Sequence, residues 1–142
     1  MSKIERMSKL RVLCLHGFRQ NGSKFKSRVG ALKKAVKSTC DLVFVDAPFC
    51  IPEGSEATAF DWDGGGTGLG ERAWWDEITD GESGTTTYHG WERSVDYIRF
   101  VVENEGPFDG VLGFSQGAVF TSVLMALQQQ EMPQQQHFSF AI

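Results

Sequence analysis

Short apolar runs occur at four places in the chain, and turn residues bound them. The first run, LRVLCL, stops at His16-Gly17, and the second, DLVFV, stops at Asp46-Ala47-Pro48. Runs of this length between turn residues are typical of buried strands. We therefore expect strands at residues 10–15, 41–45, 108–114 and 138–142.

Between these runs, apolar residues recur at intervals of three and four, which predicts amphipathic helices. The expected helices cover residues 23–38, 88–105 and 116–130, and Gly106-Pro107 ends the second. Their expected inner faces are Phe25, Val29, Leu32 and Val36; Trp91, Val95, Ile98 and Val102; and Val119, Val123 and Leu127.

Residues 49–87 hold many glycines and acids without sustained periodicity, and a structureless stretch of this length suggests a loop over a functional site. Strands and helices otherwise alternate. This order predicts an α/β fold with a doubly wound, mostly parallel sheet and helices on both faces. The length of 142 residues suits a single domain, with residues 1–9 as a flexible tail.

Composition excludes several function classes. The net charge of −4 gives no reason to expect binding to nucleic acid or to an anionic membrane, and no apolar run is long enough for a membrane span or a targeting signal. The three cysteines, Cys14, Cys40 and Cys50, form no CxxC pair. We expect reduced thiols in a cytoplasmic protein, with the nucleus as a further location, and neither a metal site nor a disulfide scaffold.

The segment Gly113-Phe114-Ser115-Gln116-Gly117 matches G-x-S-x-G, the nucleophile elbow. It lies where an expected strand ends and an expected helix begins, which is the context that this motif requires. Side chains two residues before and after the serine would clash in so sharp a turn, so glycine fits both places. The alternative is a glycine-flanked turn serine without a catalytic role.

A second glycine-containing turn, LHGFRQNG, follows the first expected strand. An oxyanion hole needs two backbone N–H groups, one from the residue after the nucleophile. We expect the amides of Phe18 and Gln116 to supply them. His16 is expected to orient the loop by hydrogen bonding rather than to act as the general base, because triad histidines come late in the chain in this fold.

Two other features are open to a functional interpretation. Residues 64–70 are rich in glycine, but no strand precedes them and no Lys-Ser/Thr follows, so they indicate a surface loop rather than a nucleotide site. Trp62, Trp74 and Trp75 could line an apolar acyl or alcohol pocket or belong to the core. The helical register of Trp91 favours the core.

Together these motifs resemble the FSH family of eukaryotic serine hydrolases. The resemblance rests on LHGFRQNG, a basic amphipathic helix, a strand ending in DAP, RAWW at 72–75 and GPFDGVLGFSQGA at 106–118. It implies an α/β-hydrolase fold and hydrolysis of carboxylic esters or thioesters. It also implies that Ser115 is the nucleophile and that Phe18 and Gln116 provide the oxyanion amides.

The chain departs from the family pattern after Ser115. The triad order is Ser, Asp or Glu, then His, and the residues after Ser115 contain one acid, Glu131, and one histidine, His137. In the family pattern both partners follow later strands. The resemblance thus implies that the triad acid and histidine lie beyond residue 142, in which case the sequence is a fragment, a short isoform or an incomplete gene model.

The sequence as a whole predicts a serine carboxylesterase or acyl thioesterase that acts on a small-molecule acyl substrate without a metal or organic cofactor. The alternative is a catalytically incomplete module that binds an acyl ligand or a protein partner. A flavodoxin-like binding domain is a weaker possibility, and the GFSQG elbow argues against it.

Overall fold

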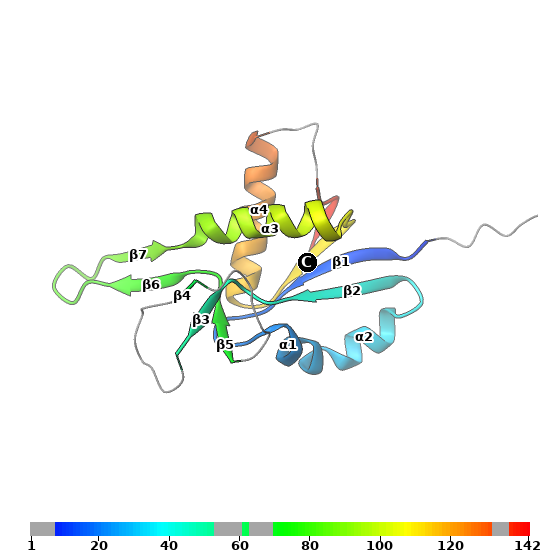
Figure 1. Cartoon of the computed structure of the whole chain (residues 1–142), viewed down its shortest axis with the longest axis horizontal. Coiled ribbons are helices and arrows are strands. Elements are labelled where there is room, and N and C mark those ends of the chain that lie inside the picture. The colour runs from blue at the N-terminus through cyan, green and yellow to red at the C-terminus, as the bar shows by residue number, and fades with distance from the viewer. Residues whose placement is uncertain (1–7, 53–60, 63–69, 132–136) are drawn as a thin grey trace, which may run out of the picture.

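Four parallel strands form the central sheet, in the order β2-β1-β8-β9 (Figure 1). The computed structural model describes residues 8–52, 61–62, 70–131 and 137–142. The strands are β1 (Leu10–Leu15), β2 (Cys40–Val45), β8 (Gly110–Gly113) and β9 (Phe140–Ala141). All four predicted strands are therefore present, and the last two are shorter than predicted.

Helices cover both faces of this sheet, as Figure 1 shows. One face carries α1 (Gly22–Arg28) and α2 (Gly30–Val36), and the other carries α3 (Trp91–Glu105) and α4 (Gln116–Glu131). This arrangement confirms the predicted doubly wound α/β architecture, which is that of an α/β-hydrolase fold.

Side chains of β1 alternate between two apolar cores, as the pleat of a strand requires. Leu13 and Leu15 point into the core under α3 and α4, whereas Val12 and Cys14 join the smaller core under α1. Burial raises the pKa of the Cys14 thiol to about 12, so Cys14 is an inert apolar group of the core. All three cysteines are free thiols.

The predicted helix over residues 23–38 is broken in two at Val29, where ψ is 23°. Phe25 is buried and Val29 is half-buried, but Leu32 is 40% exposed and α2 buries no side chain. The prediction of one continuous inner face was therefore wrong at Leu32, whereas Val36 is half-buried, as Val29 is.

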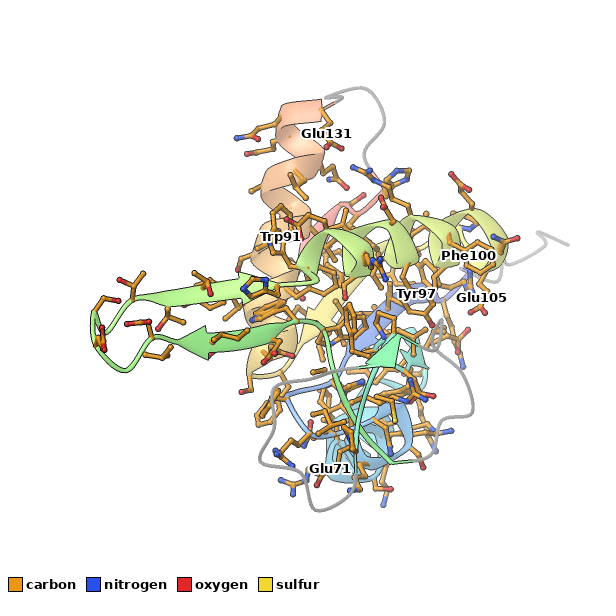
Figure 2. The ribbon with its side chains drawn as sticks, turned by 60° about the vertical axis from the view of Figure 1, so that its left-hand side comes forward. Glu71, Trp91, Tyr97, Phe100, Glu105 and Glu131 are labelled. Atoms are coloured by element: carbon orange, nitrogen blue, oxygen red, sulfur yellow. The ribbon has the colours of Figure 1, made fainter. Side chains whose placement is uncertain are left out.

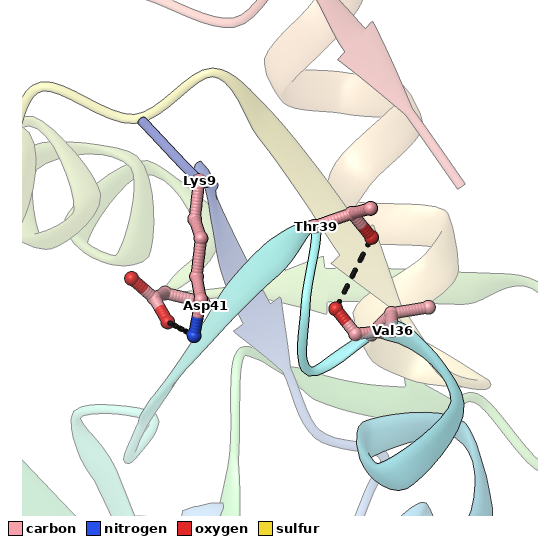
Figure 3. A network of polar contacts seen from close by, with 4 residues as sticks. All are labelled: Lys9, Val36, Thr39 and Asp41. Carbon is pink, nitrogen blue, oxygen red and sulfur yellow. Dashed lines mark hydrogen bonds and ion pairs between the residues drawn. The ribbon is translucent and has the colours of Figure 1, made fainter. Parts of the chain in front are cut away.

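Polar contacts close the turn between α2 and β2 (Figure 3). The Thr39 hydroxyl donates to Val36 O at 3.1 Å, and Lys9 Nζ lies 3.4 Å from Asp41 Oδ1 on the neighbouring strand. The backbone joins in, because the Leu10 amide donates to Thr39 O at 2.9 Å. These contacts set the register at the amino ends of β1 and β2.

The other two helices differ from prediction in their bounds or faces. Helix α3 begins at Trp91 rather than at residue 88, after Gly90 with a φ of 94°. In α4 the buried side chains are Gln116, Phe120, Thr121 and Leu124, and Val119 is 56% exposed. The inner face predicted for α4 was thus wrong at Val119, which the tight packing of the first turn rotates toward solvent, whereas Val123 and Leu127 are half-buried against the core.

Residues 49–87 contain small antiparallel sheets where no regular structure was predicted. One comprises β3 (Phe49–Ile51), β4 (Asp61–Trp62) and β5 (Glu71–Ala73); the other is a hairpin of β6 (Asp76–Thr79) and β7 (Thr86–His89). The hairpin projects away from the central sheet in Figure 1. Strands of two to four residues are too short to leave a periodic pattern in sequence.

Three of the four tryptophans belong to the core under α3 and α4. Trp74 is fully buried, Trp75 is 5% exposed, and Trp91 is half-buried against them. The Trp74 ring lies 5.0 Å from that of Phe120. The side chain of Trp62, residues 64–69 of the glycine-rich stretch, and residues 1–7 of the expected tail lie outside the described residues.

Candidate active site

The candidate site lies where β1 and β8 end side by side in the middle of the sheet. Leu15 pairs with Gly113 at the carboxyl ends of these strands. The chain continues from β1 toward β2 on one side and from β8 toward β9 on the other. A crevice forms where neighbouring connections diverge in this way, and ligands bind there in open α/β sheets. Both glycine-containing turns, one after β1 and one after β8, begin at these strand ends.

Ser115 occupies a sharp turn between β8 and α4. Its φ is 55°, in the left-handed region that non-glycine residues rarely adopt, and its side chain is exposed. A Cβ at Gly113 would lie 2.2 Å from Gly117 O, and one at Gly117 would lie 2.2 Å from Leu15 O. No side chain fits at either glycine, so the backbone conformation at Ser115 depends on both.

Helix α4 begins directly behind Ser115. The Gly117 amide donates to Phe114 O at 2.9 Å, and the Ala118 amide donates to Ser115 O at 2.9 Å. Gln116 is the first residue of α4, so its amide also lies at the N-terminus of the helix. The N-terminus of a helix carries partial positive charge, which stabilises negative charge that develops beside it.

The loop after β1 packs against this turn. A Cβ at Gly17 would lie 3.2 Å from the Phe114 ring and 3.3 Å from Phe114 O, so the two backbones are in van der Waals contact. Arg19, next to Phe18, also has a positive φ of 62°. Strained residues cluster at functional sites. Here one lies in each of the two turns, Arg19 after β1 and Ser115 after β8.

His16 holds the loop from inside. Its Nε2 accepts a hydrogen bond from the Ala47 amide at 2.9 Å, so its Nδ1 carries the proton and donates to Gly17 O at 2.8 Å. Burial lowers the pKa of His16 to about 4, which keeps the ring neutral. With both nitrogens bound to backbone groups, His16 orients the loop and is not placed to accept a proton from Ser115.

Apolar side chains are exposed around Ser115, but they are not the tryptophans that the sequence left open between an apolar pocket and the core. Phe114 directly precedes the serine and is 50% exposed; Val119, one helical turn further on, is 56% exposed, and Phe18 is 44% exposed. The Phe114 ring also stacks on that of Phe25, at 6.1 Å. We call Phe18, Phe114 and Val119 the apolar rim. Sequence periodicity missed Val119 because it assigned this residue to the core.

Glu131 and His137 lie far from Ser115. Glu131 is the last residue of α4 (Figure 2), about 22 Å along the helix from Gln116, and it pairs with Arg99. His137 precedes β9, at the amino edge of a parallel sheet, whereas Ser115 follows β8 at the carboxyl edge. Both line a hollow of about 440 Å³ between α3 and α4. They do not contribute to the site around Ser115.

The third described histidine, His89, also contacts another group, because its Nε2 lies 3.0 Å from Thr87 Oγ1. None of the three described histidines therefore hydrogen-bonds to Ser115. In the described part of the chain, no three His, Cys, Asp or Glu side chains gather to hold a metal ion. The helices described there also include none with the length and apolar character to cross a membrane.

Comparison with known proteins identifies relatives of this arrangement. Residues 3–142 match the family described as Serine hydrolase (FSH1). The chain is 37% identical to Esterase OVCA2 of Danio rerio, covering 94% of this chain and 63% of the relative. It is 40% identical to Esterase OVCA2 of Xenopus tropicalis, with 94% and 59% covered, and 34% identical to Esterase CG5412 of Drosophila melanogaster, with 92% and 46% covered. The chain thus spans about three fifths of the length of the vertebrate relatives.

Proposed function

Since the chain belongs to the serine hydrolase (FSH1) family, we propose that the protein hydrolyses carboxylic esters or acyl thioesters with Ser115 as its nucleophile. One observation carries the proposal: Ser115 is exposed with a φ of 55° between two glycines at a strand-to-helix turn. That conformation projects the hydroxyl above the sheet at the N-terminus of a helix. Relatives named esterases support the same chemistry.

In the proposed reaction, Ser115 Oγ attacks the acyl carbonyl while a general base accepts the hydroxyl proton. The amides of Phe18 and Gln116 hold the oxyanion of the tetrahedral intermediate. The alcohol or thiol leaves with a proton, and water then hydrolyses the acyl-enzyme. His16 and His89 hydrogen-bond to other groups than Ser115, so neither is assigned as the base.

The apolar rim supports an apolar acyl or alcohol group in the substrate. Phe114 and Val119 expose carbon surface beside Ser115, and Phe18 exposes it in the loop that packs against Phe114. A substrate that covers this surface gains about 25 cal/mol for each Å² removed from water. Neither a metal nor an organic cofactor enters this mechanism.

A fluorophosphonate probe tests the nucleophile. The protein should be expressed from its own gene with an N-terminal tag, and we call this protein the gene product. The 142-residue chain is expressed in parallel. We expect labelling of the gene product on Ser115, complete loss of labelling in Ser115→Ala, and normal labelling in Ser122→Ala, a control on an exposed position of α4. Labelling that survives Ser115→Ala would refute the assignment.

A second function, binding of an acyl ligand without turnover, is favoured by the absence of a base beside Ser115 in the described residues. Hydrolysis of p-nitrophenyl esters by the 142-residue chain separates the two. Residual turnover is expected, because oxyanion stabilisation alone gives a small acceleration. Robust turnover that depends on Ser115 would show that the 142-residue chain does include the base.

A further inference from the structure

The side chain of Gln116 is buried, although its backbone begins the helix behind the exposed Ser115. Its carboxamide makes two hydrogen bonds to consecutive residues of a distant segment. Oε1 accepts from the Trp74 amide at 2.9 Å, and Nε2 donates to Trp75 O at 3.0 Å. The elbow is thereby tied to a segment more than 40 positions away in sequence.

That segment also holds the loop that carries Phe18. Trp74 Nε1 donates to His16 O at 2.8 Å. Arg72 forms two backbone hydrogen bonds with the loop: the Arg19 amide donates to Arg72 O and the Arg72 amide donates to Gln20 O, both at 2.9 Å. The Phe18 amide therefore lies between two residues, His16 and Arg19, that hydrogen-bond to residues 72–74.

We propose that the Gln116 side chain is a positioning residue that fixes the Phe18 amide relative to the Gln116 amide through residues 72–75. The inference rests on the proposed function, because it assigns a role in forming the oxyanion hole. Two donors from separate elements must meet one oxygen within a narrow range of distances. Pairing of β1 with β8 ends at Leu15 and Gly113, so it does not itself place the loop beyond.

Buried hydrogen bonds make this link strong. Replacing Gln116 by Leu would leave the Trp74 amide and Trp75 O, both in a buried segment, without these partners, and a buried polar group without a partner is strongly unfavourable. Ser94 holds the same segment from α3, since its hydroxyl donates to Trp74 O at 2.5 Å. Ser94→Ala thus loosens residues 72–75 without changing the elbow.

The other end of α4 offers a matched control. Gln128 Nε2 donates to Phe138 O at 2.8 Å, and Gln128 Oε1 accepts from the Phe138 amide at 2.9 Å. Gln128 is thus a second glutamine of α4 whose carboxamide accepts from one backbone amide and donates to one backbone carbonyl, but its partner Phe138 lies at the amino edge of the sheet. Gln128→Leu removes an equivalent link that does not reach the loop of Phe18.

Amide hydrogen exchange tests the link in the 142-residue chain, and fluorophosphonate labelling tests its consequence in the gene product. In Gln116→Leu we expect exchange at Trp74, Arg19 and Arg72 to accelerate at least tenfold and the labelling rate of Ser115 to fall at least tenfold. Gln116→Glu keeps an acceptor for the Trp74 amide, so its exchange rates and its labelling rate should lie between those of wild type and Gln116→Leu. Gln128→Leu should accelerate exchange at Phe138 alone and leave labelling unchanged.

Unchanged exchange at Arg19 and Arg72 in Gln116→Leu would overturn the inference, as would an unchanged labelling rate. If Gln116→Leu does not fold, exchange at Arg19 and Arg72 and the labelling rate of Ser115 are measured in Ser94→Ala and Gln116→Glu instead. Wild-type gene product that is not labelled at Ser115 would refute the proposed function instead, while the exchange data would still report on the link.

Discussion

His16 donates from Nδ1 to Gly17 O and accepts at Nε2 from the Ala47 amide, so a single buried ring connects the loops after β1 and β2. The Trp74 ring lies 5.3 Å from it. A charged imidazolium could not accept from the Ala47 amide and would be desolvated. Burial lowers the pKa of His16 from its ordinary value of 6.5 to about 4.

The pH dependence of stability should report this histidine. The unfolded chain takes up the proton near pH 6.5, whereas the folded chain resists it down to about pH 4. Neutral His16 therefore makes its full contribution to the free energy of unfolding above pH 6.5. This contribution, about 3 kcal/mol, declines as the pH falls from 6.5 to 4 and is absent below pH 4. Urea unfolding of wild type and His16→Gln from pH 7.5 to 4.5 measures it, and equal pH slopes would contradict this account.

The junction of β8 with α4 depends on two glycines rather than on helix propensity. A Cβ at Gly117 would collide with Leu15 O at 2.2 Å and His16 O at 2.6 Å, both on backbone that cannot move without displacing β1. Strand and helix can approach only because these side chains are absent. The same packing exposes Val119 beside Ser115 and turns Phe120 toward Trp74.

Substitution of these glycines should separate close packing from intrinsic helix preference. We expect Gly117→Ala to destabilise the protein by about 1–3 kcal/mol through overpacking. Gly30→Ala is the control, since Gly30 begins α2 with no atom within 4 Å of a built Cβ. Removing glycine from that helix should be neutral or add up to about 1 kcal/mol. Urea unfolding compares them, and equal effects would contradict the close approach.

Contacts between remote parts of the chain hold the amino edge of the sheet together. Arg11 on β1 donates from Nη1 to Glu105 O and to Pro107 O, each at 2.7 Å, and its guanidinium lies 4.7 Å from the centroid of the Phe108 ring. Figure 2 shows Glu105 at the end of α3. The residues joined are more than 90 positions apart, so these bonds connect the first strand to the end of α3.

Arg11→Met should therefore destabilise the whole molecule. The side chain keeps its apolar stem but loses two charge-assisted hydrogen bonds, for which we expect a cost of about 1–3 kcal/mol. Arg28→Met, on the exposed side of α1, should change stability by less than about 0.5 kcal/mol. Thermal unfolding of both variants measures the difference. A loss as small for Arg11→Met as for Arg28→Met would show that solvent replaces these bonds.

Several features followed from the sequence alone because neighbouring residues encode them. The apolar run at Leu10–Leu15 is a strand with those bounds, the order of elements predicts the doubly wound sheet, and the glycines around Ser115 indicate a sharp turn. Periodicity and backbone sterics act over a few residues, so they can be derived from local spacing. The roles assigned to Ser115 and to the Phe18 and Gln116 amides remain predictions for the labelling experiments.

Only the tertiary structure decided the features that depend on partners distant in sequence. Sequence spacing placed Val119 in the core, yet contact with the ends of β1 turns it outward. Trp74 and Trp75, which suited a pocket equally well, proved to be core. No local signal marks the Gln116 carboxamide for the Trp74 backbone 42 positions away. Such choices follow from which surfaces meet when the chain packs, and that is a property of the whole fold.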